Sequence, residues 1–196
     1  WSQTGVADGL WYYGVVGRDV AGNSSPLSNV LSVVMDGSAP TLTVAFSPDG
    51  AIGPGPMTVG VASSEPLIGT PDLTFRPYGS NLPVAVALSQ VSATTWSGTA
   101  TILSNMPSGQ ATLSATARDL AGNVFSGTPA GETLILDTLG PVASITTNPV
   151  EPVQVLAPRT VAVSVSLNEV QALAAVPTLT FVPPVGSPVA VTLLGS

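Results

Sequence analysis

Carboxylates are almost the only side chains in this chain that could carry acid–base or metal chemistry. The 196 residues include eleven aspartates and glutamates, four basic residues that are all arginine, and neither histidine nor cysteine. Paired carboxylates can perform general acid–base catalysis without histidine, and Glu65 and Asp72 are close enough in sequence to be considered. In the internal repeat described below, Glu65 recurs as Glu169 but Asp72 is replaced by Thr178. We therefore expect solvated or turn-capping carboxylates and no catalytic residue.

Calcium binding is the second chemistry that carboxylates offer. Ca²⁺ takes about six to eight oxygen ligands, usually from several carboxylates in one compact loop. The chain has no Asp-x-Asp-x-Asp loop, but single acids recur or stand at proline-containing junctions, where they could meet in space. These acids are Asp19, Asp36, Glu65, Asp119, Asp137 and Glu169. The alternative is that they close turns, so we expect no cofactor, with calcium as the one candidate.

Aromatic side chains could bind carbohydrate by stacking on sugar rings. The relevant residues are Trp1, Trp11, Tyr12, Tyr13, Tyr78 and Trp96. Trp11 and Tyr13 share a face with Val15, which predicts a place in a core, whereas Tyr12 lies on the opposite face. Trp96 lies in a segment rich in threonine and serine, which we interpret as a strand edge with an exposed ring. One exposed ring does not form a binding platform.

The composition excludes several classes of function. Without histidine, cysteine or lysine there is no Ser-His-Asp triad, thiolate metal site, disulfide or Schiff-base lysine. The net charge is −7 and charged residues make up 8% of the chain, so we expect no nucleic-acid partner. No apolar run approaches the ~18 residues of a membrane span, and no signal peptide is indicated.

The elements that must position these side chains are β-strands. Apolar and polar residues alternate in short runs that end at glycine, proline, asparagine or aspartate, which is typical of strands in a β-sandwich. We expect residues 170–176, the best helical candidate, to form a loop or a single turn. The predicted inward faces are Leu42, Val44 and Phe46; Val59 and Val61, with Met57 at the strand's edge; Leu73 and Phe75; Val84, Val86 and Leu88; Leu113, Ala115 and Ala117; and Leu134 and Leu136.

The chain repeats itself with a period of about 100 residues. The strongest match is the hexapeptide RDVAGN, which returns as RDLAGN. The correspondences are 18–23 with 118–123 (offset 100), 36–40 with 137–141 (offset 101), 83–88 with 188–193 (offset 105) and 71–77 with 177–183 (offset 106). A period of this length is that of one sandwich domain rather than of a small solenoid repeat.

This repeat divides the chain into one complete module and parts of two others. We expect residues 40–139 to form the complete module, residues 1–39 to end a preceding module, and residues 140–196 to begin a following one. The chain is then an excerpt from a longer protein. Proline restricts its own φ and the conformation of the residue before it, so the short segments that lead to Pro40 and Pro141 predict stiff junctions.

Particular motifs resemble known bacterial modules. Residues 11–30 (WYYGVVGRDVAGNSSPLSNV) look like the last two strands of a bacterial fibronectin type III module, with Trp11 near the place of the corner tyrosine. The complete copy is similar to bacterial immunoglobulin-like repeats of large surface proteins. These repeats share Ser-Glu-Pro after the second strand, here residues 64–66, and an Ala-x-Asp-x-Ala-Gly-Asn hairpin, here residues 117–123.

The resemblance implies an all-β fold of tandem immunoglobulin-like modules in a bacterial extracellular or cell-surface protein. We expect a non-catalytic spacer or stalk whose partners are the neighbouring modules of the same chain. The alternatives are an adhesin that binds a glycan or protein receptor, and a decoration of a large polymorphic toxin or secreted hydrolase. The partial modules could also complete one another between chains as exchanged strands, although an excerpt from a longer chain accounts for the same facts.

Overall fold

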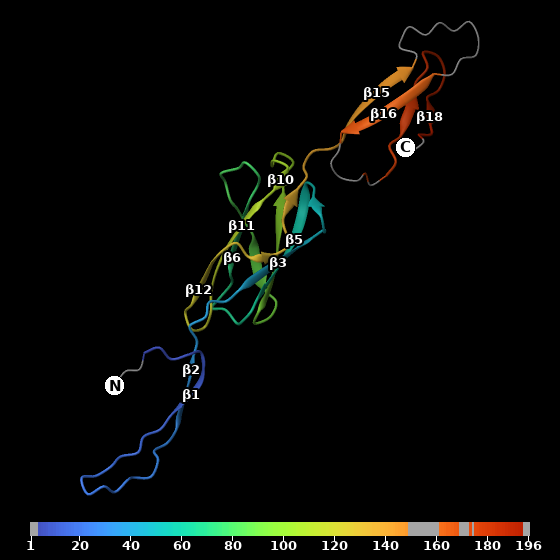
Figure 1. The fold of residues 1–196 in the computed structure, drawn as a ribbon. Coiled ribbons are helices and arrows are strands. Elements are labelled where there is room, and N and C mark those ends of the chain that lie inside the picture. The colour runs from blue at the N-terminus through green and yellow to red at the C-terminus, as the bar shows by residue number, and fades with distance from the viewer. Residues whose placement is uncertain (1–3, 149–160, 169–172, 174, 194–196) are drawn as a thin grey trace. The chain divides into compact units, whose positions relative to one another are not determined.

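A computed structural model describes residues 4–148, 161–168, 173 and 175–193 of the chain. The described residues form β-strands and connecting loops without any helix, which confirms the all-β prediction (Figure 1). The chain divides into two compact units, Trp1–Thr138 and Leu139–Ser196. The boundary between them falls in the segment that leads to Pro141, and each unit is described by itself below.

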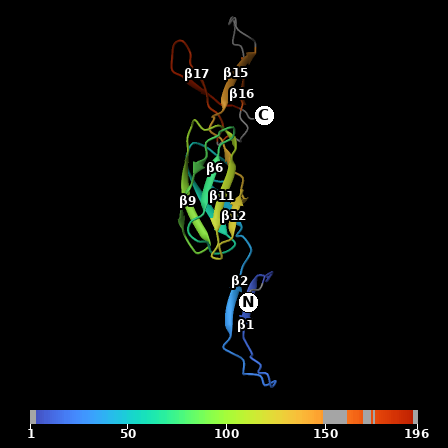
Figure 2. The same ribbon diagram turned by 90° about the vertical axis from the view of Figure 1, so that its left-hand side faces the viewer.

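Residues 40–138 of the first unit form two larger sheets that face one another (Figures 1 and 2). The five-stranded sheet has the order β13-β3-β5-β9-β8, and the four-stranded sheet has the order β12-β11-β6-β7. Neighbouring strands are antiparallel, except that β13 runs parallel to β3. The bounds are β3 Leu42–Ser47, β5 Gly55–Ser63, β6 Asp72–Arg76, β7 Val84–Ala85, β8 Ala87–Gln90, β9 Thr95–Ile102, β11 Thr112–Arg118, β12 Val124–Gly127 and β13 Ala130–Gly131.

The last part of the module leaves the four-stranded sheet. After β12 the chain crosses to pair with β3 as β13, and it then enters a small sheet of order β10-β14-β4. In that sheet β14 is antiparallel to β10 and parallel to β4. The bounds are β4 Ala51–Ile52, β10 Gly109–Gln110 and β14 Ile135–Leu136. The strands that begin and end the module are therefore neighbours.

One hydrophobic core lies between the two larger sheets. Side chains on β3 and β11 alternate strictly between buried and exposed, as expected for strands with one face toward a core and the other toward water. The predicted inward faces are confirmed as buried, with Val84 and Leu88 only partly buried at the rim. Met57 is also fully buried in β5, so its prediction as an edge residue is wrong.

Trp96 corrects another prediction. Its side chain is only 2% exposed, not an exposed ring at a strand edge. The reason is that β9 lies between β5 and β8, so both of its edges are paired and its inward face meets the core. The indole N–H of Trp96 has no hydrogen-bond acceptor among the described residues.

Before this module lies a β-hairpin, in which β1 (Gly9–Tyr13) is antiparallel to β2 (Leu31–Met35). Trp11 and Tyr13 were predicted to lie in a core, on the face that they share with Val15. Tyr13 is half-buried, but Trp11 and Val15 are 38% and 69% exposed. The prediction is wrong for Trp11, because β1 and β2 form a two-stranded sheet by themselves. The indole N–H of Trp11 donates a hydrogen bond to the Ala7 carbonyl, four residues upstream, at 2.8 Å.

The hairpin is built like the last part of the complete module. Gly109 pairs with Leu136, and the residues that correspond to them in the repeat, Gly9 and Met35, pair in the same way. The two glycines also share an unusual backbone conformation, with φ of +130° at Gly109 and +138° at Gly9. The repeat in the sequence is thus also a repeat in strand register.

The second unit contains two two-stranded antiparallel sheets, β15 (Val142–Asn148) with β16 (Ala162–Asn168), and β17 (Leu179–Phe181) with β18 (Val189–Val191). Their registers also follow the repeat. Leu42 pairs with Ser63 in the complete module, and the corresponding Ala143 and Leu167 pair here. In the same way, the pair Thr74 and Ala85 corresponds to the pair Thr180 and Ala190. Most of the predicted loop 170–176 lies outside the described residues.

Candidate carboxylate site

Three carboxylates converge in the first unit, where the segment after β2 meets the complete module. One oxygen from each of Asp36, Glu65 and Asp119 lies within 4.8 Å of the other two. Asp36 follows β2, Glu65 follows β5 and Asp119 follows β11, so three turns that are distant in sequence bring them together. Asp36 is exposed, Glu65 is half-buried and Asp119 is fully buried.

The turn after β11 holds the Asp119 carboxylate in place. Its Oδ1 accepts hydrogen bonds from the backbone N–H groups of Gly122 at 2.6 Å and Asn123 at 2.8 Å, and its Oδ2 accepts one from Asn123 Nδ2 at 2.8 Å. Burial acts to raise the pKa of Asp119, but the hydrogen bonds from Asn123 and Gly122 bring this pKa below its ordinary value. Asp119 is thus an ionised, turn-closing residue, as hydrogen bonding to a carboxylate favours its charged form.

The same turn occurs in the hairpin, but there it is exposed. Asp19 Oδ1 accepts the Asn23 N–H at 2.8 Å, and Asp19 Oδ2 accepts Asn23 Nδ2 at 2.9 Å. The hydrogen bonds from Asn23 lower the pKa of Asp19. The turn-closing role expected of both aspartates is therefore confirmed, and it does not depend on burial.

Among the three carboxylates, Glu65 is the one whose ionised form is disfavoured by its surroundings. Burial is the largest cause that raises its pKa, followed by the negative charges of Asp36 and Asp119. A hydrogen bond with Asp36 and the charge of Asp8 raise the pKa further. Since every contribution acts in the same direction, a proton or a cation bound beside Glu65 would relieve repulsion in the cluster.

Residues 36–40, the linker between the hairpin and the complete module, are hydrogen-bonded to both of these parts. Asn123 Nδ2 donates to the Asp36 carbonyl at 3.2 Å, which joins the turn after β11 to the linker. On the hairpin side, the Asp8 carboxylate accepts the Gly37 N–H at 2.8 Å and the Ser38 hydroxyl at 2.5 Å. These bonds from Ser38 and Gly37 lower the pKa of Asp8.

The structure brings together half of the acids that the sequence offered for calcium. Asp36, Glu65 and Asp119 meet, whereas Asp19 and Asp137 are not in the group and Glu169 lies outside the described residues. Asp72 is also outside the group, and its carboxylate accepts a hydrogen bond from Thr116 at 3.4 Å. Asp8 was missed by sequence reasoning, because its counterpart in the repeat is Ser108 and it therefore gave no recurrent signal.

Chemically, the cluster offers oxygen ligands for a hard cation. Three carboxylates would supply fewer ligands than the about six to eight that Ca²⁺ takes, so backbone carbonyls or water would have to supply the others. The oxygens of Asp119 are already hydrogen-bonded within its turn. The carboxylates of Asp36 and Glu65 are therefore the ones best placed to bind a cation.

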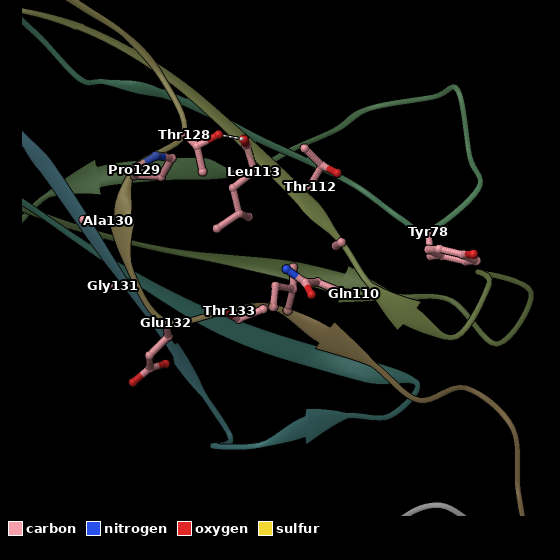
Figure 3. Close-up of a pocket in the computed structure, with 12 residues that line it drawn as sticks. Tyr78, Gln110, Thr112, Leu113, Thr128, Pro129, Ala130, Gly131, Glu132 and Thr133 are labelled. Atoms are coloured by element: carbon pink, nitrogen blue, oxygen red, sulfur yellow. Dashed lines mark hydrogen bonds between the residues drawn. The ribbon is translucent and has the colours of Figure 1, made fainter.

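A separate cavity of about 430 Å³ lies beside β10 and β11 in the complete module. Figure 3 shows Tyr78 at one end of it and Thr128 near the other, with Gln110 between them. The Tyr78 ring lies close to Gly109, where an added Cβ would meet it at 3.0–3.1 Å. Glu132 points away from Gln110 (Figure 3) and accepts the Phe46 N–H at 2.7 Å.

The aromatic residues considered for carbohydrate binding lie in different parts of the first unit: Trp11, Tyr12 and Tyr13 on β1, Tyr78 beside this cavity and Trp96 in the core. Tyr78 is the only aromatic side chain that lines this cavity, and Trp96 is buried in the core. Trp1 lies outside the described residues. No helix in the described part of the chain is long and apolar enough to cross a membrane. No family model matches the chain, and no curated protein matches it at a significant level.

Proposed function

We propose that the chain consists of tandem bacterial immunoglobulin-like β-sandwich modules that act as a non-catalytic spacer or stalk in a large extracellular or cell-surface protein. The modules would be residues 1–39, 40–139 and 140–196, the first of them related to fibronectin type III modules. This role requires regular modules and defined joints between them. It requires no catalytic residue or cofactor.

The observation that carries the proposal is a hydrogen bond donated by a backbone N–H group at each of the two junctions, which we call the linker tie. Gly37, which follows Asp36, donates its N–H to the Asp8 side chain at 2.8 Å. Thr138, which follows Asp137, donates its N–H to Ser108 Oγ at 2.9 Å. In both places the chain that leaves a module is hydrogen-bonded to the residue just before an earlier strand of that module, β1 in one case and β10 in the other. Two ties of the same geometry support joints that are specified by the sequence, as a stalk requires.

Small-angle X-ray scattering of the 196-residue chain tests the stalk. We expect a narrow range of maximum dimensions for the wild type and a broader range for Asp8→Ala, which removes the acceptor of the Gly37 N–H and of the Ser38 hydroxyl. Asp49→Ala is the matched control, because it removes an exposed carboxylate from the loop between β3 and β4. A wild-type chain as flexible as the Asp8→Ala variant would contradict the proposal.

Calcium at the carboxylate site stays a prediction within this function. Bound between Asp36 on the linker and Glu65 on the module, a divalent cation would link the two parts and stiffen the joint. The grouping of three carboxylates is compatible with this role, and the melting experiment in the Discussion tests it.

A glycan- or receptor-binding module is the second candidate. The cavity beside Tyr78 favours it, because an aromatic ring and amide and hydroxyl side chains line the same hollow. A glycan array tests this candidate, with Tyr78→Ala to remove binding and Tyr12→Ala as the control for an exposed ring elsewhere. Binding that is equal in the two variants would argue against the cavity.

A further inference from the structure

The cavity beside β10 and β11 lies where the four-stranded sheet of the complete module opens. β12 pairs with β11 from Arg118 as far as Ala115, which lies opposite Gly127. The chain then leaves β11 to pair with β3, and it returns at Leu134, whose carbonyl accepts the Ala111 N–H at 2.9 Å. Between these two contacts no strand of the described residues lies beside β11 on this side. The cavity of about 430 Å³ occupies this gap, and every residue that lines it belongs to the complete module.

Backbone groups of β11 face the gap. The Ala111 N–H bonds across it, and the Leu113 carbonyl accepts a hydrogen bond from the Thr128 hydroxyl at 3.2 Å (Figure 3). The N–H and C=O groups of one strand residue point to the same edge, so the Leu113 N–H and the Ala111 C=O are directed into the gap as well. No acceptor for the Leu113 N–H is found among the described residues, because β12 has already left β11.

This N–H group belongs to a buried residue, since Leu113 is 7% exposed. Backbone N–H groups of buried residues almost always have a hydrogen-bond partner, which is protein, water or ligand. The cavity is therefore suited to an occupant that carries a hydrogen-bond acceptor. Because the donor is part of a strand paired with β6, its position is fixed before any ligand binds.

The side chains that line the cavity are of two kinds. Gln110, Thr112 and Thr133 contribute amide and hydroxyl groups. Pro129 and Leu134 are buried and contribute apolar surface. Such a lining fits a ligand that has both an apolar face and several hydrogen-bonding groups.

Tyr78 adds an aromatic ring at one end of the cavity (Figure 3). Its side chain is 65% exposed, so a face of the ring is accessible to a ligand. The ring also lies against Gly109, where an added Cβ would be 3.0 Å from Tyr78 Cβ and 3.1 Å from Tyr78 Cγ. Tyrosine is common at binding surfaces because it joins a large apolar ring to a polar hydroxyl.

The charges of the lining restrict the class of ligand. None of the residues that line the cavity is basic, and Glu132 is the one charged residue among them. Glu132 points away from Gln110 (Figure 3) and is engaged by the Phe46 N–H at 2.7 Å. An acidic ligand would find no cation in the cavity, and a charge buried without a partner is unfavourable.

We propose that this cavity binds an uncharged saccharide, with one sugar ring stacked on Tyr78 and a hydroxyl oxygen accepting the hydrogen bond of the Leu113 N–H. Saccharides present an apolar C–H face together with hydroxyl groups that donate and accept, as the lining requires. The cavity volume lies in the range of about 300–1,000 Å³ that is usual for small-molecule sites. The inference rests on the second candidate of the proposed function and names its ligand class, and it does not depend on the spacer role.

Nuclear magnetic resonance of the nitrogen-15-labelled 196-residue chain tests the site directly. Lactose, maltose, cellobiose and N,N′-diacetylchitobiose are the neutral probes, and digalacturonic acid and sialyllactose are the acidic probes. At millimolar concentration we expect at least one neutral probe to shift the Leu113 amide resonance, and the acidic probes to leave it unchanged. The Ala115 amide is the internal control, because Ala115 keeps its strand partner Gly127.

Substitutions test the contacts with the neutral probe that binds best. Tyr78→Ala should weaken binding by about tenfold or more, whereas Tyr78→Phe should change it by less than about threefold, because it retains the ring. Gln110→Ala should weaken binding by about fivefold through loss of a hydrogen bond. Gln90→Ala, which changes an exposed glutamine on β8, is the matched control. Tyr78 and Gln110 are exposed, so their variants should keep the wild-type melting temperature.

Other results overturn the inference in distinguishable ways. An acidic probe that shifts the Leu113 amide as much as the neutral probes refutes the uncharged class but keeps glycan binding. An uncharged peptide of threonine and valine that shifts this amide when no saccharide does shows that the gap accepts a strand. Equal affinity of the wild type and Tyr78→Ala refutes stacking on Tyr78.

The absence of any shift at Leu113 also refutes the inference. A Tyr78-dependent signal on the glycan array would in that case preserve the second candidate function, whereas no such signal would remove both. The spacer proposal stands in either case, because it rests on the linker ties.

Discussion

The hairpin at residues 9–35 and the last part of the complete module at residues 109–136 share a turn and a terminal strand register but lie in two different environments. Both have the Asp-x-Ala-Gly-Asn turn, and both pair their terminal residues in equivalent register. Burial separates them, since Ala115 is 3% exposed and its counterpart Val15 is 69% exposed. Turn chemistry and register are therefore local properties, whereas a core residue exists only where another sheet covers it.

The largest expected difference in stability is between substitutions of the buried Trp96 and of the more exposed Trp11. Trp96→Ala should lower the free energy of unfolding by about 3–5 kcal/mol, as large-to-small changes in cores do, whereas Trp11→Ala should cost less than about 1 kcal/mol. Urea unfolding of both variants measures the difference. Trp96→Phe should cost much less than Trp96→Ala, because it retains most of the ring and removes the unsatisfied N–H. Similar losses at Trp96 and Trp11 would contradict the comparison.

Among the described residues, the crossing of the chain from β12 to β13 occurs only in the complete module, and Gly131 permits it. Gly131 has φ of +104°, and a Cβ there would overlap the backbone of Val44. The corresponding hairpin segment, residues 24–35, contains no glycine. Gly131→Ala should therefore cost more than Gly50→Ala, which has positive φ but open space and should cost about 1 kcal/mol. Thermal unfolding of both variants is the measurement, and equal losses would show that only φ matters.

Glu65 and Asp119 lie in the same cluster but should respond to pH with opposite signs. The pKa of Glu65 is raised, so its ionisation opposes folding and its contribution to stability falls as pH rises through the folded pKa. The pKa of Asp119 is lowered, so its contribution is present above the unfolded pKa and is lost as pH falls through the folded pKa.

Melting temperatures across pH measure this opposition. Without metal at neutral pH, Glu65→Gln should raise the melting temperature, and Asp119→Asn should lower it. Asp19→Asn, in the exposed turn, should lower it less than Asp119→Asn does. A destabilised Glu65→Gln variant would contradict the view that repulsion dominates at Glu65.

Calcium should produce the smallest effect, and only at the buried copy of the turn. The melting temperature of the wild type should rise modestly from chelator to millimolar calcium, because a ligand of the folded state stabilises it. Glu65→Gln should lose this response and Asp19→Asn should keep it. An unchanged wild-type melting temperature would remove calcium from the proposed function.

Local patterns predicted much of the fold. Alternation identified the buried faces of β3, β6 and β11, and the segments matched by the repeat form strand pairs in equivalent registers. Trp96 could not be placed in this way, because the order of strands in a sheet is a long-range property. Trp11 was misplaced because alternation shows which residues share a face, but not whether anything covers that face.

The carboxylate site was only partly accessible to the same reasoning. Asp36, Glu65 and Asp119 could be selected because each recurs or stands at a junction. Their meeting depends on three separate turns, and no local pattern encodes it. Asp8 has serine as its counterpart, so the repeat gave no reason to select it.

The parallel pairing of β13 with β3 and of β14 with β4 has a consequence for a chain under tension. A pull applied at Pro40 and Thr138 acts on neighbouring strands in opposite directions along their length, which is a shear geometry. Bonds such as Glu132 N–H to the Val44 carbonyl at 3.1 Å and Asp137 N–H to the Ile52 carbonyl at 2.9 Å would carry the load together. An antiparallel hairpin such as β1–β2, pulled from its two ends, opens one pair at a time. Under the same force the complete module should therefore hold after the hairpin has unzipped.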